Sequence, residues 1–185
     1  MKFQPKKFYH STEDLKQFHF QLKQIPCPHC KSIGFLNLHG YLRGYADKQY
    51  RKKIVRGRRL FCCHRDQRKG CGRTFSILAA SVIKKFIISA ESLWHFLKNI
   101  LKGYNKIHAF KAAGIPFAES SCYRLWKIFR LHQTNIRSKL LRLSPTPMNL
   151  THSPAIQTIM HLRCAFKNSA FPITSFQNQF QASFL

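Results

Sequence analysis

The spacing of apolar residues differs between two parts of the chain. Between about residues 25 and 78, apolar and polar residues partly alternate in short runs separated by glycines, as in half-buried strands. The strand candidates are Phe35–Leu42, Ile54–Cys62 and Arg73–Leu78. From about Glu91, apolar residues instead recur every three or four positions, which is the period of amphipathic helices. The pattern therefore predicts an α+β protein, in which a small β region precedes an all-α region.

Three helices are predicted in the all-α region. The first runs from about Glu91 to Gly103, the second from Asn105 to Gly114, and the third from about Ala118 to at least Leu131. The second helix is short, and the turn after it contains Gly114 and Pro116. These lengths and this turn are typical of a helix-turn-helix.

Both ends of the chain are also expected to be helical. Thr12 is the expected N-cap of a helix over Glu13–Gln24, which has acidic residues in its first turn. The segment Ser144–Pro147 has the composition of a linker. After it, apolar spacing predicts one helix over Ile156–Phe166 and a second carrying Phe176, Phe180 and Phe184. We expect these C-terminal helices to pack back on the domain or to form a homodimer contact.

Charge narrows the choice of partner. The 32 Lys and Arg residues oppose only six Asp and Glu residues, giving a net charge of +26. Such a chain repels itself unless a polyanion neutralises it, and nucleic acid is favoured over an anionic membrane. The six carboxylates are Glu13, Asp14, Asp47, Asp66, Glu91 and Glu119. They form no set able to hold the divalent ions of a nuclease or a strand-transfer enzyme, so we expect no enzymatic activity.

Cysteine spacing supplies the strongest chemical signal. Cys27 and Cys30 form a C-x-x-C turn, and Cys62 and Cys71 follow about thirty residues later, Cys71 between two glycines. We therefore predict that Cys27, Cys30, Cys62 and Cys71 bind one structural zinc ion. Either Cys63 or His64 could replace Cys62 as the third ligand, since neighbouring strand residues point to opposite faces. Cys122 and Cys164 occupy apolar helical positions and are expected in the core.

Two groups of residues are expected to contact nucleic acid. The first lies in and before the second strand candidate and next to Cys71, where basic residues are dense enough to follow a phosphate backbone. The second is the exposed side of the third helix, where serine and arginine suit phosphates and base edges. The predicted residues are Arg51, Lys52, Lys53, Arg56, Arg58, Arg59 and Arg73 in the first group, and Ser120, Ser121, Tyr123, Arg124 and Lys127 in the second.

Two motifs also carry a resemblance to a known family. The segments CPHC at 27–30 and RRLFCCHRDQRKGCGRTFSIL at 58–78 resemble the zinc ribbon of bacterial insertion-sequence transposases, and GYNKIHAFKAAGIPFAESSCYRLWKIF at 103–129 resembles their helix-turn-helix. The resemblance covers about residues 25–142 and departs from the family in two ways. The gap between Cys62 and Cys71 is longer, and the catalytic carboxylate domain is missing. It implies DNA binding related to transposition, without strand transfer by this chain alone.

The sequence thus predicts four regions: an N-terminal helix at 1–24, a zinc ribbon at 25–78, a helix-turn-helix at 79–143, and a linker with a C-terminal helical segment at 144–185. We expect a zinc-dependent protein that binds duplex DNA, and a separate transposase subunit is a candidate partner. An RNA-binding zinc ribbon and a catalytic recombinase or nuclease are the alternatives. No apolar run is long enough to span a membrane and no signal peptide is evident, which favours a cytoplasmic, nucleoid-associated location without membrane contact.

Overall fold

The computed structural model describes residues 6–45, 53–64, 69–115, 117–147 and 153–185. These residues form an α+β protein with a four-stranded sheet and six α-helices. The chain divides near residue 80 into two compact units, here called the sheet unit (up to Ala80) and the helical unit (Ser81–Leu185). The predicted N-terminal helix belongs to the sheet unit, and the C-terminal segment belongs to the helical unit.

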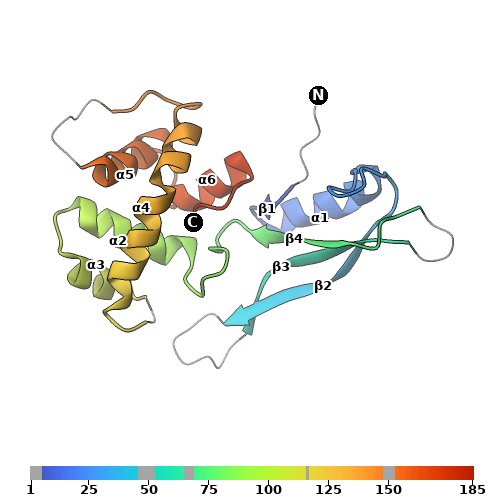
Figure 1. Cartoon of the computed structure of the whole chain (residues 1–185), viewed down its shortest axis with the longest axis horizontal. Helices are drawn as coiled ribbons and strands as arrows, with labels where there is room; N and C mark the ends of the chain where they lie inside the picture. The colour runs from blue at the N-terminus through green and yellow to red at the C-terminus, as the bar shows by residue number, and fades with distance from the viewer. Residues whose placement is uncertain (1–5, 46–52, 65–68, 116, 148–152) are drawn as a thin grey trace. The chain divides into compact units, whose positions relative to one another are not determined.

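The sheet unit has four strands in the order β1-β4-β3-β2 (Figure 1). Strands β2 (Leu36–Tyr45), β3 (Lys53–Cys62) and β4 (Thr74–Ala79) pair antiparallel. The two-residue strand β1 (Phe8–Tyr9) pairs parallel with β4, and the sequence pattern did not predict it.

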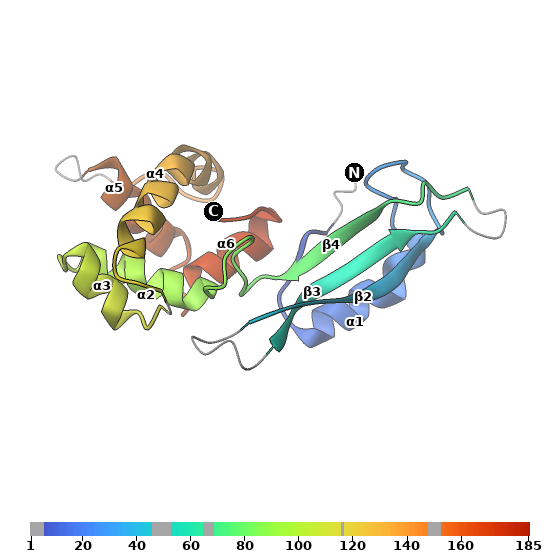
Figure 2. The same ribbon diagram turned by 60° about the horizontal axis from the view of Figure 1, so that its bottom comes forward.

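Helix α1 (Thr12–Gln21) covers one face of this sheet, as Figure 2 shows, and continues into the 3-10 turn η1 (Leu22–Gln24). Phe18 and Leu22 pack there with buried strand residues into a small core. The N-cap is Ser11, whose hydroxyl accepts a hydrogen bond from the Asp14 backbone N–H, so the predicted Thr12 cap is wrong by one residue.

The helical unit contains α2 (Ala90–Leu101), α3 (Lys106–Ala112), α4 (Ser121–Leu140), α5 (Pro154–Ala165) and α6 (Pro172–Phe180). Ser89 caps α2 and Asn105 caps α3, each by accepting a backbone N–H bond on its side-chain oxygen. Helix α4 packs against α5, and α2 packs against α3, α5 and α6.

The C-terminal helices share the core of the helical unit. Phe184 is buried, with its ring 6.1 Å from that of Phe129 and 5.4 Å from that of Phe176. Helix α6 ends at Phe180, so Phe184 lies beyond the helix that the sequence predicted to carry it. Buried Gln177 holds the segment after α6 in place. Its amide N–H₂ donates to Val82 O, and its side-chain carbonyl accepts from Phe184 N–H.

Candidate metal centre and cationic surfaces

Four cysteine sulfurs converge at one end of the sheet unit. The Sγ atoms of Cys27, Cys30, Cys62 and Cys71 all lie within 4.8 Å of one another. The Sγ–Sγ distance is 3.8 Å between Cys27 and Cys71 and 3.7 Å between Cys30 and Cys62. A tetrahedral ion with metal–sulfur bonds of about 2.3 Å places its sulfurs about 3.8 Å apart. The four thiols, which form no disulfide, are thus compatible with one structural metal ion.

The first ligand pair sits on a tight turn. Lys31 N–H donates to Cys27 O, and Cys27 N–H donates to Ser32 O, both at 2.9 Å. Lys31 adopts a positive φ of 64°, which closes the turn. This places Cys30 at the exposed side of the cluster, whereas Cys27 is fully buried.

The second pair comes from the end of β3 and the return toward β4. Gly72 N–H donates to Cys62 O, and Cys62 N–H donates to Arg73 O, both at 3.0 Å. A Cβ at Gly70 would lie 1.9 Å from Cys63 O, and one at Gly72 would lie 2.9 Å from His64 Nδ1. Gly72 also has a φ of +70°. The two glycines around Cys71 are therefore needed for the close backbone approach that brings its sulfur to Cys62.

Of the three candidates for the third ligand, only Cys62 joins the cluster. Cys63 is buried, and its N–H donates to Phe35 O at 2.8 Å. His64 is exposed, with its ring 5.7 Å from the Phe61 ring. Among the remaining cysteines, Cys122 is buried as expected, but Cys164 is exposed, so its predicted core position is wrong.

The local environment shifts the pKa values of two of these thiols in opposite directions. Hydrogen bonds from the hydroxyl and backbone of Ser32 lower the pKa of Cys30 to about 6. Burial raises the pKa of Cys62 to about 12. Ser32 was not singled out by the sequence, although its position two residues after a C-x-x-C turn is a signal that could have identified it. A cation among the sulfurs favours the thiolate form of both residues.

Strand alternation separates the basic residues of β3. Arg58 lies on the face that carries Leu60 and Cys62, while Arg59 lies on the opposite face and is exposed. The pairing with β2 shifts register between Gly57 and Val55, so this alternation does not extend to Arg56 or to Lys53, which is exposed and lies beside the Tyr45 ring. Arg73, which precedes β4, is also exposed. Arg51 and Lys52 lie outside the described residues. The predicted basic patch is thus divided between two faces.

Two of these arginines are partly enclosed. The Arg58 guanidinium stacks on the ring of Tyr41 at 3.7 Å, and its Nε atom is buried. The Arg56 side chain crosses Gly44, where a Cβ would lie 2.5 Å from Arg56 Cδ. Burial lowers the pKa of Arg56. The exposed cations of the described sheet unit therefore include Lys53, Arg59 and Arg73, whereas Arg56 and Arg58 are half-buried.

The predicted residues of the third helix lie at the start of α4. Ser120, Tyr123, Arg124 and Lys127 are exposed, and Ser121 is half-buried. However, α3 ends at Ala112 and α4 begins at Ser121, so residues 113–120 connect them. A helix-turn-helix has a turn of three or four residues, and this connection is longer.

Within the described residues, the four cysteines are the one group of three or more His, Cys, Asp or Glu side chains placed to share an ion. Asp47 and Asp66 lie outside those residues. No helix in the described part of the chain has the length and apolarity needed to cross a bilayer. Comparisons with protein-family models, curated proteins and solved structures gave no match to this chain.

Proposed function

We propose that this chain is a zinc-dependent DNA-binding protein. The observation that carries the proposal is the convergence of four cysteine sulfurs at spacings a tetrahedral ion requires, in a chain of net charge +26. Zinc suits an all-sulfur tetrahedron, and a closed shell of four protein ligands leaves no position for a reacting water. Its role is to hold the turns that carry Cys30 and Cys71.

Electrostatics supports nucleic acid as the partner. Arg59 and Arg73 are exposed on the sheet unit, and Arg124 and Lys127 are exposed on α4. Cations of this kind bind phosphates and release the counterions condensed on the duplex. Phosphate binding by α4 does not require helix-turn-helix geometry. The resemblance to transposase DNA-binding regions supports a role beside a separate catalytic subunit, with no strand transfer by this chain.

RNA is the second candidate, and one observation favours it. On the sheet face opposite Leu60 and Cys62, the Phe61 ring lies 5.8 Å from the His39 ring and 5.7 Å from the His64 ring. Both histidines are exposed, as is Arg59 on the same strand as Phe61. An aromatic group beside a cation can stack on unpaired bases, which structured RNA offers in its loops.

A salt titration separates these candidates. The zinc-loaded full chain is titrated with labelled duplex DNA, single-stranded DNA and structured RNA between about 50 and 200 mM salt. We expect duplex DNA to compete at least as well as RNA, and log affinity to fall linearly with log salt. Arg59→Ala with Arg73→Ala should reduce the duplex slope by about 2, because two phosphate contacts are lost.

The chain offers a matched control for this double variant. Arg163 and Lys167 are exposed cations of the helical unit, outside both predicted groups, and replacing both with alanine removes the same charge. This control should leave the slope nearly unchanged. An equal reduction in both double variants would show that net charge, not the proposed surface, determines binding. Stronger binding to RNA at every salt concentration would favour the alternative.

A further inference from the structure

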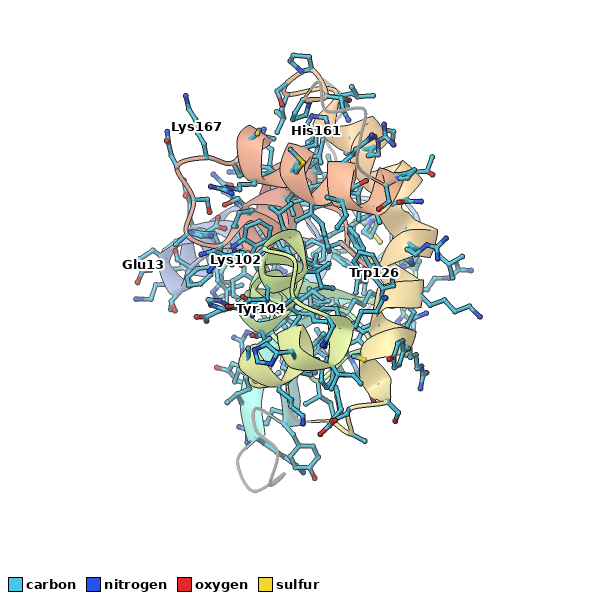
Figure 3. The ribbon with its side chains drawn as sticks, turned by 90° about the vertical axis from the view of Figure 1, so that its left-hand side faces the viewer. Glu13, Lys102, Tyr104, Trp126, His161 and Lys167 are labelled. Carbon is cyan, nitrogen blue, oxygen red and sulfur yellow. The ribbon has the colours of Figure 1, made fainter. Side chains whose placement is uncertain are left out.

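A cleft of about 820 Å³ lies within the helical unit, between α3, the first half of α4 and the start of α5. Three aromatic residues line it: Tyr104 from the α2–α3 turn, and Tyr123 and Trp126 from α4. Figure 3 views this side of the helical unit, with Tyr104 at the turn and Trp126 on α4. Only Tyr123 of these three was chosen by sequence reasoning.

A lysine and a histidine side chain lie beside the aromatic rings. Lys106 Nζ lies 5.9 Å from the centre of the Tyr123 ring, and the His108 ring meets the Tyr104 ring edge-on at 4.9 Å. Lys111 also lines the cleft and pairs with Glu119 at 2.8 Å. Since no acidic residue among those the structure describes lines the cleft, its walls favour an anionic ligand.

Core packing does not account for the two tyrosines, whereas Trp126 packs partly against the core beside Phe129. Tyr104 is 45% exposed and Tyr123 is 55% exposed, whereas the core rings of Phe96 and Phe110 are 1% exposed or less. The tyrosines therefore keep much of their ring surface free for a ligand. The two tryptophans also differ, because Trp94 is buried in the core while Trp126 is half-buried at the cleft wall.

We propose that this cleft binds unstacked bases of single-stranded nucleic acid, with Lys106 near the adjoining phosphates. The inference rests on the proposed nucleic-acid binding and adds a second contact of different specificity. Aromatic side chains in a positively charged groove stack on successive bases of a single strand. A base-paired duplex keeps its base faces stacked inside, so it cannot offer them to a concave aromatic wall. The helical unit thus selects frayed, gapped or single-stranded segments.

Tryptophan fluorescence gives a direct test with the zinc-loaded full chain. A short single-stranded oligonucleotide of mixed sequence should quench Trp126 emission as it stacks, while buried Trp94 stays unchanged. Trp126→Phe should abolish the quenching. Tyr104→Ala should weaken single-strand binding by about tenfold and leave blunt duplex binding unchanged. Phe20→Ala, which removes a ring that is 87% exposed on α1, is the matched control and should have no effect.

Three other titrants define the opposing outcomes. Heparin supplies charge without bases, polyglutamate represents an acidic protein partner, and a blunt duplex supplies paired bases. Quenching of Trp126 by any of these to the same extent as by the oligonucleotide would overturn the proposal. So would duplex binding with no single-strand quenching, which leaves the proposed DNA binding intact. Failure to bind either nucleic acid would instead contradict both the single-strand proposal and the proposed DNA binding.

Discussion

The backbone N–H of Cys71 donates a hydrogen bond to Cys62 Sγ, with an N···S distance of 3.4 Å. The two residues are nine positions apart in the chain, and the bond joins the last residue of β3 to the loop that returns toward β4. A bond of this kind stabilises a thiolate, so the loop that supplies one ligand also prepares another for metal binding.

Gly70 makes this return possible, and its replacement should weaken the metal site. A Cβ at Gly70 would lie 1.9 Å from Cys63 O, so Gly70→Ala must displace the loop and the sulfur of Cys71. We expect zinc affinity, measured by competition with a chromogenic chelator, to fall at least about tenfold, as a shift of about 1.4 kcal/mol would give. Gly40→Ala is the control, since its Cβ would meet nothing within 4 Å. Equal affinity in both variants would contradict this account of the loop.

Metal affinity should rise with pH. Burial raises the pKa of Cys62 to about 12, so this thiol is protonated near neutral pH and must release its proton when it binds an ion. Hydrogen bonds lower the pKa of Cys30 to about 6, so Cys30 also releases a proton on metal binding only near and below that pH. Between about pH 7 and 8, zinc affinity should therefore increase at least about tenfold per pH unit. An affinity independent of pH would show that Cys62 is not a ligand.

Acid should destabilise the helical unit through His161. This fully buried imidazole lies with Nε2 3.0 Å from Ser144 O, and Nδ1 has no hydrogen-bond partner. Burial lowers its pKa, so below the unfolded-state value of about 6.5 the unfolded chain binds the proton more readily. Stability should therefore fall as the pH drops through about 6.5.

The variant His161→Gln keeps a donor for Ser144 O and cannot titrate. Thermal unfolding followed by tryptophan fluorescence should show a smaller loss of stability between pH 7 and 5 in this variant than in the wild type. His132→Gln, at a half-buried position of α4, should keep the wild-type pH dependence. The same acid sensitivity in all three proteins would exclude His161 as its source.

Phe184 should stabilise the helical unit despite its place near the chain end. Its ring packs between Phe129 and Phe176 and is 1% exposed. Phe184→Ala should lower the free energy of unfolding by about 3–5 kcal/mol, as other buried phenylalanine truncations do. Phe171→Ala, at an exposed position before α6, should cost much less in the same urea titration. Similar costs for the two variants would contradict the packing described here.

Local chemistry explains what the sequence could predict. The C-x-x-C turn and the glycines around Cys71 require tight backbone geometry that few other arrangements satisfy, so all four ligand candidates could be identified. The second helix was predicted to start at Asn105, and Asn105 caps α3 because its side chain satisfies an orphan N–H group at the helix start. Alternation and helical periodicity were sufficient for the α+β class.

Long-range packing explains what the sequence could not predict. Strand β1 has two residues, too few for a period, and exists because it pairs with β4. The basic run of β3 suggested one patch, but alternation sends Arg58 toward Tyr41 and Arg59 to the opposite face. Cys164 fits an apolar spacing yet is exposed, because α5 buries a different stripe that includes Ile159 and Leu162.

The central claim is that one zinc ion, held by the four cysteines, maintains the surface that binds DNA. The most direct test is a fluorescence anisotropy titration of a labelled duplex with the same full-length sample before zinc removal, after it, and after zinc is restored. We predict tight, salt-sensitive binding that is lost on chelation and regained when about one zinc per chain is added back. Equally tight binding by the zinc-free protein would contradict the claim.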